Sequence, residues 1–583
     1  MLKTLSKSIR EYKKTSVKSV VYITLEVIFE ILIPLCMARL LDKGIIAGQM
    51  NVVIKYGVIL LVLALLQLAT GMLAAVLSAR AAAGFAANLR HDIFKNVQTF
   101  SFSNIDRFST ASIVTRLTTD VTNVQNAYQM IIRMAVRSPG MLIFSLAVAF
   151  SIDHKISLIF LAVIPALGFL LYLIIRKVFP IFERVFKRYD KLNNVVQENL
   201  RGIRVVKSFN QEKHETGKFN AISEEIFSDF TRAEKIIALN SPIMQFFMYG
   251  CLIFISWFGA KAIVLSSNNE LLGLTTGQLT ALITYAIQIL VSLMMLSMVF
   301  AMITIAQSSA QRITEILNET SDITNPQQPV TEVENGSVTF DHVSFMYKKN
   351  ADKKVLDDIS FSIRTGETVG IIGATGSSKS SLIQLIPRLY DTSGGSVSVS
   401  GKDVRSYDLD VLRNEVAVVL QKNVLFSGTI KENLRYGNEN ASDEEIELAC
   451  RLSCADEFIS SMKDGYDTYI EQGGTNVSGG QKQRLCIARA LIKKPKILIL
   501  DDSTSAVDTK TDAIIQKSFK SYIPETTKII IAQRISSVQN ADKIIVLDDG
   551  KINAIGTHEE LLKSCSIYSE IFETQMKGAS SNE

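Results

Sequence analysis

Residues 367–389 read ETVGIIGATGSSKSSLIQLIPRL, an apolar strand pattern at 367–372 that runs through glycines into a helical pattern at 382–389. A glycine-rich turn that opens a helix presents backbone N–H groups to an anion, which suits phosphate groups. Lys379 can neutralise phosphate charge there, and the Ser380 hydroxyl can reach Mg²⁺. We therefore expect ATP and Mg²⁺ to bind this segment, through Gly373, Thr375, Gly376, Ser377, Ser378, Lys379, Ser380 and Ser381.

Two further features refine this phosphate site. Ser378 stands where the phosphate-binding pattern usually has glycine, which adopts backbone angles that other residues rarely adopt. We expect Ser378 to weaken nucleotide binding. Downstream, residues 497–500 form an apolar run that ends in Asp501, as in a buried parallel strand that delivers a carboxylate to Mg²⁺.

The first half of the chain carries long apolar stretches. A bilayer-spanning helix needs about 20 mainly apolar residues, and six stretches qualify, at 17–41, 53–78, 131–152, 156–178, 240–265 and 276–306. The connections after the second and fourth stretches are long and rich in Lys and Arg. Basic residues also precede the first stretch, which predicts a cytoplasmic N-terminus. One stretch alone could be a buried helix of a soluble protein, but six with alternating short and long loops indicate a membrane domain.

Length and composition limit the other classes. The 583 residues exceed what one hydrophobic core holds. We expect a membrane domain of six transmembrane helices at 1–320, a linker at 321–335 and an α/β P-loop ATPase domain at 336–583. The net charge of +5 argues against a nucleic-acid partner. Cys450 and Cys454 share a helix face, but no histidine lies nearby to complete a zinc site.

Residues 477–481, Val-Ser-Gly-Gly-Gln, resemble the signature motif of ABC transporter ATPase domains. Gln421 resembles the Q-loop glutamine, Tyr347 the adenine-stacking aromatic residue, and residues 505–508, ending in Asp508, the D-loop. Residues 106–110 and 198–202 also match hallmarks of the family. The order of six helices and then an ATPase domain is similar to the half-transporters of bacterial multidrug exporters. The resemblance implies the type I exporter fold, a plasma-membrane location and a cytoplasmic ATPase domain.

The resemblance also implies how the site is assembled. Two ATPase domains of this family close head to tail, so that the signature residues of one touch the γ-phosphate of ATP held by the other. The signature residues here are Ser478, Gly479, Gly480 and Gln481, of which Ser478 and Gly480 are expected to touch the γ-phosphate. Mg²⁺ is expected on Ser380, Gln421 and Asp501. Short transverse helices near 100–106 and 199–207 are expected to couple the ATPase domains to the membrane helices.

Two departures from the family bear on catalysis. Asp502 follows the Mg²⁺-binding Asp501 where competent family members have Glu, and Gln533 stands where they have the switch His. A general base one methylene shorter loses hydrogen-bond reach, and a glutamine cannot carry positive charge. With Ser378, the chain's own site is altered at three positions, while its signature motif is intact. This predicts a heterodimer whose non-identical partner has the competent Glu and His; a slow homodimer, or a chain altered to trap ATP, is the alternative.

The cargo is less constrained. Glu26 and Glu30 share one face of the first span and are candidates for binding a cationic substrate, unless they pair with Arg133 or Arg137. Met294 and Met298 in the sixth span suit a surface that repacks around varied compounds, although ordinary helix packing explains them as well. Hydrophobic or amphipathic small molecules are the expected cargo. A lipid or peptide exporter, or a nucleotide-gated regulatory or channel subunit, is the alternative.

Overall fold

The computed structural model of the chain describes residues 1–266, 268, 273–348, 353–502 and 507–580. It comprises two compact units. One contains Met1–Gln98 and Ser109–Glu319, and the other contains Thr99–Phe108 and Thr320–Glu583. The short segment Thr99–Phe108 therefore packs with the ATPase unit although it lies within the membrane half of the sequence.

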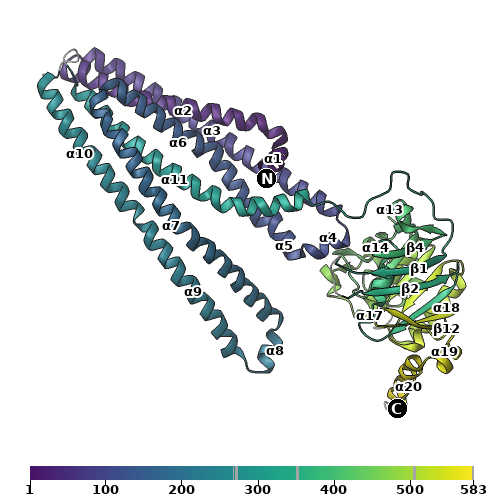
Figure 1. The fold of residues 1–583 in the computed structure, drawn as a ribbon. Helices are drawn as coiled ribbons and strands as arrows, with labels where there is room; N and C mark the ends of the chain where they lie inside the picture. Colours follow the sequence, from purple (N-terminus) through teal and green to yellow (C-terminus); the bar gives the residue numbers. More distant parts are fainter. Residues whose placement is uncertain (267, 269–272, 349–352, 503–506, 581–583) are drawn as a thin grey trace. The chain divides into compact units, whose positions relative to one another are not determined.

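The first unit is helical (Figure 1). Within the described residues, six helical stretches are long and apolar enough to cross a membrane, as the sequence predicted. Several spanning helices continue far beyond the apolar stretch, so α3 has 49 residues and α7 has 48. The elements are α1 (Leu2–Ser6), η1 (Lys7–Tyr12), α2 (Lys13–Leu40), η2 (Leu41–Ile46), α3 (Met50–Gln98), α5 (Thr110–Thr115), η3 (Arg116–Asp120), α6 (Val121–Ile152), α7 (His154–Arg201), α8 (Ile203–Ser208), α9 (Glu212–Ala238), α10 (Asn240–Ser266) and α11 (Thr276–Asn318).

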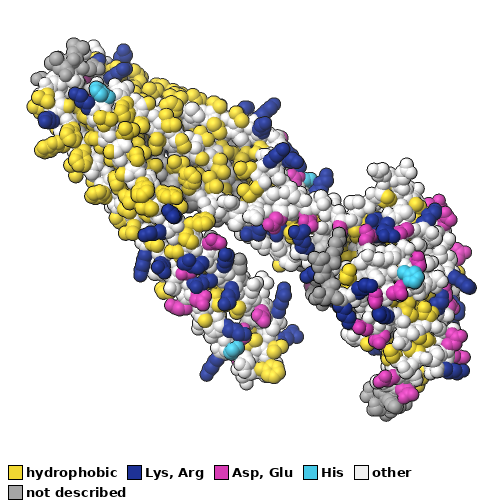
Figure 2. Space-filling view, in the orientation of Figure 1, with side chains coloured by type: hydrophobic (Ala, Val, Ile, Leu, Met, Phe, Trp, Pro, Cys, Tyr) yellow, Lys and Arg dark blue, Asp and Glu magenta, His cyan; other side chains and the backbone are white. Residues whose placement is uncertain are grey.

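The surface of this unit divides by chemistry (Figure 2). Hydrophobic side chains cover the part formed by α2, α3, α6 and α10, and Lys, Arg, Asp and Glu side chains gather on the ends of α7 and α9 next to α8. Large apolar side chains such as Trp257 and Val264 are exposed there. A lipid environment removes the cost of such exposure, because its acyl chains are as apolar as these side chains.

Buried polar contacts join helices that are distant in sequence. Asp120 accepts hydrogen bonds from Ser309 Oγ at 2.8 Å and from Arg312 Nε at 2.8 Å, which ties the start of α6 to α11. The buried Tyr285 hydroxyl donates to the carbonyl of Ile31 at 2.7 Å. In apolar surroundings such bonds also satisfy groups that water cannot reach.

The second unit is α/β. Its central sheet has the order β12-β11-β3-β10-β9-β6, with β12 antiparallel to β11 and the other pairs parallel. A second sheet, β2-β1-β4-β5, is antiparallel. The strands are β1 (Val338–Phe345), β2 (Leu356–Ile363), β3 (Thr368–Gly373), β4 (Gly394–Val399), β5 (Lys402–Asp403), β6 (Val416–Val419), β7 (Gly428–Thr429), β8 (Tyr469–Ile470), β9 (Ile497–Asp501), β10 (Thr527–Ile531), β11 (Lys543–Asp548) and β12 (Lys551–Gly556).

Helices complete the unit, some packed against the sheets, such as α17 against β6, and others against neighbouring helices, such as α20 against α19. They are α4 (Phe102–Arg107), α12 (Lys379–Gln384), η4 (Val404–Ser406), α13 (Leu409–Glu415), α14 (Ile430–Arg435), α15 (Asp443–Leu452), α16 (Asp456–Ile459), η5 (Gly465–Asp467), η6 (Gln472–Gly474), α17 (Gly479–Ile492), α18 (Thr509–Tyr522), η7 (Ile535–Ser537), α19 (His558–Ser564) and α20 (Ser566–Ser580). The helix predicted at 382–389 is wrong in its bounds, since α12 ends at Gln384. Pro387 disfavours helical angles in the residue before it, and Arg388 has a positive φ of 51°.

Two glycines of α3 give opposite predictions. A Cβ at Gly84 would overlap the Tyr12 ring, whereas a Cβ at Gly57 meets nothing within 4 Å. We expect Gly84→Ala to destabilise the helical unit by about 1–3 kcal/mol through overpacking. Gly57→Ala should leave its stability unchanged or raise it by up to about 1 kcal/mol, because alanine favours helix. Thermal unfolding of the purified chain in lipid measures both. Equal effects would contradict the packing of residues 7–12 on α3.

A candidate nucleotide site

The predicted phosphate segment lies at the carboxyl ends of the parallel strands. β3 leads into the glycine-rich loop, and α12 begins at Lys379. A cavity of about 300 Å³ lies there. It is lined by Thr375, Gly376, Ser378, Lys379, Ser380, Ser381, Gln421, Asp501, Asp502, Ile531 and Gln533. The structure thus brings together residues that the sequence assigned to one site from four separate segments.

The Lys379 ammonium lies inside the loop. Its Nζ donates to the carbonyls of Gly373 at 2.9 Å and Ala374 at 2.8 Å, and to Ser377 Oγ at 3.2 Å. Burial lowers the pKa of Lys379, and the carboxylates of Asp501 and Asp502 oppose that shift. A charged group held by loop carbonyls can exchange them for phosphate oxygens, which are stronger acceptors.

The residues expected at Mg²⁺ fit such an ion. Ser380 Oγ donates to Asp501 Oδ1 at 3.1 Å, so a hydroxyl and a carboxylate oxygen meet beside the loop. Burial raises the pKa of Asp501, and the neighbouring Asp502 charge adds to that rise. Among the described residues no group of three or more His, Cys, Asp or Glu side chains forms a protein-only metal site. Mg²⁺ usually takes one or two protein ligands plus phosphate and water oxygens, which this pair can supply.

Asp502 is held by side chains from two other segments. Gln533 Nε2 donates to Asp502 Oδ2 at 2.8 Å, and Gln421 Nε2 lies 3.5 Å from the same oxygen. The backbone of Asp502 has a φ of 47°, in the left-handed region that non-glycine residues rarely adopt. Burial raises the pKa of Asp502, against the lowering effect of the Gln421 hydrogen bond and of Lys379.

Gln483 was not among the predicted site residues, but it also reaches this carboxylate segment. Its buried Nε2 lies 3.4 Å from the backbone carbonyl of Asp502. Gln483 lies two positions after the signature-like residues 477–481, and that proximity was the signal that could have identified it. Gln483 therefore links α17, which begins at the signature residues, to the strand end that carries Asp502.

Ser378 explains why glycine is usual at its position. It has φ 70° and ψ 21°, the left-handed conformation, immediately before α12. An L-residue with a Cβ is less stable there than glycine. The Ser378 side chain also makes no capping hydrogen bond to α12. The strain at this position agrees with the expectation that Ser378 weakens the loop, which remains a prediction for nucleotide affinity.

Other predicted site residues lie outside the cavity lining. Tyr347 is 47% exposed, and its hydroxyl is 2.8 Å from Ser381 Oγ. Ser478 caps α17, accepting from Gln481 N at 3.3 Å while Gln481 Oε1 accepts from Ser478 N at 2.9 Å. Gly479 and Gly480 form the first turn of α17. Residues 505 and 506 of the predicted D-loop lie outside the described residues, and Asp508 caps α18.

The membrane candidates also have defined surroundings. Arg137 Nη2 lies 2.7 Å from Glu30 Oε2 and 3.8 Å from Glu26 Oε1, so the pairing considered as an alternative forms in the structure. Met294 and Met298 are exposed on α11. The two glutamates share one guanidinium, which leaves their role in cargo binding a prediction.

Removing the backbone strain at Ser378 should stabilise the phosphate loop in its folded conformation. We expect Ser378→Gly to raise the stability of the ATPase unit by up to about 1 kcal/mol and to tighten nucleotide binding. Thermal unfolding with and without Mg-ATP measures both effects. Ser377→Gly is the matched control, since Ser377 has no positive φ and its hydroxyl contacts Lys379. A Ser378→Gly variant no better than this control would contradict the strain.

The buried Asp502 carboxyl predicts a pH dependence. Because its pKa is raised, the folded chain holds this proton more strongly than the unfolded chain, and ionisation as pH rises costs stability. Without nucleotide, Asp502→Asn should be more stable than the unmutated chain at pH 7–8, with the difference shrinking toward pH 4.

Asp508 supplies the control of opposite sign for that pH series. The backbone N–H of Thr511 lowers its pKa, so Asp508→Asn should lose stability at neutral pH and little in acid. Thermal unfolding between pH 4 and pH 8 compares the variants. Stabilisation by Asp502→Asn that is equal at every pH would contradict the predicted ionisation.

Comparison with known proteins identifies the family. Residues 17–294 match the ABC transporter transmembrane region, and residues 356–505 match the ABC transporter family. The ABC transporter ATP-binding protein YfiB of Bacillus subtilis is 37% identical over 550 residues, 94% of each chain. The ABC transporter ATP-binding protein Rv1273c of Mycobacterium tuberculosis is 34% identical over 99% of each chain.

A solved structure supports the fold. That of a bacterial Atm1-family ABC exporter with ATP bound has a TM-score of 0.83 to this chain, covering 97% of this chain and 98% of that one at 24% identity. The TM-score shows that the two chains share a fold, and at 24% identity the likeness concerns the fold alone. The predicted fold class, six long apolar helices of the type I exporter followed by a P-loop ATPase domain, is confirmed. This multi-pass membrane protein with bacterial homologues belongs to the ABC transporter family, as a half-transporter whose ATPase domain is coupled to transport.

Proposed function

We propose that this chain is one subunit of a heterodimeric exporter of hydrophobic or amphipathic compounds. It holds Mg-ATP in a degenerate site of its own and gives its signature motif to the competent site of a non-identical half-transporter. The observation that carries this proposal is the Asp502 carboxylate, which receives a hydrogen bond from Gln533 at 2.8 Å. The group expected to activate water is thereby paired with the group expected to sense the γ-phosphate.

The chemistry of these side chains supports binding more than turnover. A general base must lie within hydrogen-bond reach of the water it activates, and a misplacement of about 1 Å costs roughly a hundredfold in rate. Asp502 is one methylene shorter than Glu. Gln533 can donate a hydrogen bond to a γ-phosphate but brings no positive charge. Lys379, Ser380 and Asp501 retain the chemistry of phosphate and Mg²⁺ binding.

The signature residues support a role in the opposite site. Ser478 begins α17, and a hydroxyl with helix N-terminal amides suits an anion. These residues do not line the cavity around Lys379. In a dimer, the signature motif of this chain contacts the ATP held by the partner, whereas the phosphate loop of this chain holds a different ATP. The signature motif can therefore be intact while this chain's own site is altered.

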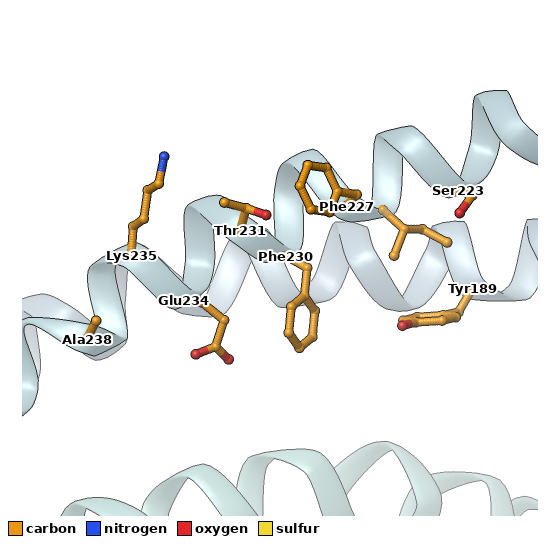
Figure 3. A pocket seen from close by; sticks show the side chains of 9 residues that line it. Tyr189, Ser223, Phe227, Phe230, Thr231, Glu234, Lys235 and Ala238 are labelled. Carbon is orange, nitrogen blue, oxygen red and sulfur yellow. The ribbon is translucent and has the colours of Figure 1, made fainter.

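An exposed groove on the helical unit supports the proposal that the partner is a second half-transporter. A hollow of about 590 Å³ lies on α7 and α9, where Tyr189, Phe227 and Phe230 are exposed (Figure 3). It is lined by Tyr189, Ser223, Ile226, Phe227, Phe230, Thr231, Glu234, Lys235 and Ala238. The lining includes the charged side chains of Glu234 and Lys235, which disfavour contact with lipid acyl chains. Half-transporters of this family dimerise, and an aromatic groove is typical of an interface core.

Turnover by the chain alone tests the proposal. We expect the purified chain in lipid to bind Mg-ATP, measured with a fluorescent ATP analogue, and to hydrolyse it at a rate near that of an Asp501→Asn control. If the chain binds the ATP analogue but does not hydrolyse ATP, the missing activity is a property of the nucleotide site and not of an unfolded protein. Robust turnover by the unmutated chain would sink the degenerate-site proposal and make the protein a self-sufficient homodimer.

The double variant Asp502→Glu with Gln533→His extends this test. A gain of roughly a hundredfold would assign the missing activity to these two side chains. Negligible turnover in this variant as well, with ATP still bound, would assign it to a different partner chain. Both outcomes support the proposal, provided that the unmutated chain stays inactive.

A further inference from the structure

Tyr390 links the ATPase unit to the short helix α4. It lies between α12 and β4 and is 9% exposed. Its hydroxyl donates to Asp106 Oδ2 at 2.6 Å, although the two residues are 284 positions apart. The Phe102 ring of α4 lies 6.0 Å from the Tyr390 ring, edge to face. All of these residues belong to the same compact unit.

The Tyr390 ring also contacts the ring of Tyr347, the residue expected to stack on adenine. The Tyr347 and Tyr390 ring centroids are 5.2 Å apart with planes at 86°, an edge-to-face pair. The buried Phe345 ring contacts both, at 4.9 Å from Tyr347 and 5.6 Å from Tyr390. Through its hydroxyl, Tyr347 also meets Ser381 in the first turn of α12. The buried Tyr390 ring thus contacts both Tyr347, on the nucleotide side, and Phe102 of α4.

The contact between Tyr390 and Asp106 is a hydrogen bond as well as a packing contact. A hydroxyl that donates to a carboxylate forms a short, charge-assisted and directional hydrogen bond. Burial, with Asp106 beside it, raises the pKa of the Tyr390 hydroxyl, in agreement with a protonated donor that faces a carboxylate. A phenylalanine at this position would fill the same space without orienting α4.

Two other contacts hold α4 without touching Tyr390. Ser103 Oγ donates to Asp322 Oδ2 at 2.7 Å, and Asn104 Nδ2 donates to the carbonyl of Thr320 at 3.3 Å. Both reach the segment before β1 rather than the nucleotide side. They fix α4 to the unit and supply a matched control for the Tyr390 contact.

We propose that Tyr390 is a positioning residue that passes occupancy of the adenine site at Tyr347 to α4 through Asp106. Adenine stacked on the exposed face of Tyr347 restricts that ring and therefore the Tyr390 ring packed edge-on against it. The hydroxyl of Tyr390 then holds Asp106, and with it α4, in one orientation. This inference rests on ATP binding, as in the proposed function, and on the adenine-stacking role that the family resemblance implies for Tyr347; it does not depend on the heterodimer.

Amide hydrogen exchange of residues 99–108 tests the relay in the full-length chain in lipid nanodiscs. Saturating Mg-ATP should slow exchange in this segment by about fivefold or more, the lower end of typical coupling between sites. Tyr390→Phe should bind ATP within about twofold of the unmutated affinity and lose this slowing. Ser103→Ala should keep it.

A second pair of measurements separates the relay from general packing. Asp106→Ala should abolish the response as Tyr390→Phe does, and the double variant should lose no more than either alone, because both remove one contact. Inorganic tripolyphosphate with Mg²⁺, at a concentration that displaces the fluorescent ATP analogue, should leave exchange in 99–108 unchanged, because it lacks the purine.

Several results would overturn the inference. Tyr390→Phe that still responds to ATP, or tripolyphosphate that slows exchange as ATP does, would exclude the path through Tyr347. A Tyr390→Phe chain that loses ATP affinity and thermal stability together would make Tyr390 a packing residue. A chain that binds no ATP would refute the proposed function of the site itself, whereas ATP binding without any change at 99–108 would refute only the relay.

Discussion

The hydrocarbon core of a bilayer offers no partner for a backbone N–H or C=O group, and this constraint shapes the whole helical unit. Every spanning segment must satisfy its own backbone, so the chain crosses as long uninterrupted helices. α3 and α7 continue well beyond the apolar stretches, with 49 and 48 residues. A continuous helix transmits displacement along its axis, because its turns are joined by hydrogen bonds. The same constraint makes buried contacts such as Asp120 with Arg312 effective ties between helices.

The ATPase unit follows from a different geometric rule. Parallel strands end at one edge of the sheet, so side chains that follow separate strands converge there. β3 delivers the phosphate loop, β9 delivers Asp501 and Asp502, and β10 leads to Gln533. Bringing these groups together strains the backbone and buries ionisable groups. Ser378 and Asp502 adopt positive φ, and burial raises the pKa of both adjacent carboxyls. Such strain and buried charge are typical of sites kept for a ligand rather than for stability.

The two proposals share the idea that this chain's nucleotide acts by being held. A site in which Gln533 pairs with Asp502 suits retention of ATP. A retained nucleotide can still act if its occupancy changes a contact elsewhere, and Tyr390 with Asp106 offers such a contact. Binding energy that differs between two arrangements is sufficient to shift an equilibrium, and hydrolysis at the same site is not required.

The sequence by itself determined the six spans, the phosphate loop, the Asp501 strand and the departures at Ser378, Asp502 and Gln533. Each is written in residues that are neighbours in the chain, as a run of apolar side chains or a motif of fixed spacing. Only the tertiary structure decided that Gln421 and Gln533 meet one oxygen of Asp502, that Arg137 pairs with Glu30, and that Tyr390 reaches Asp106. Those partners lie 31 to 284 residues apart. Local periodicity fixes which face a side chain occupies, whereas its distant partner depends on how strands and helices pack against one another.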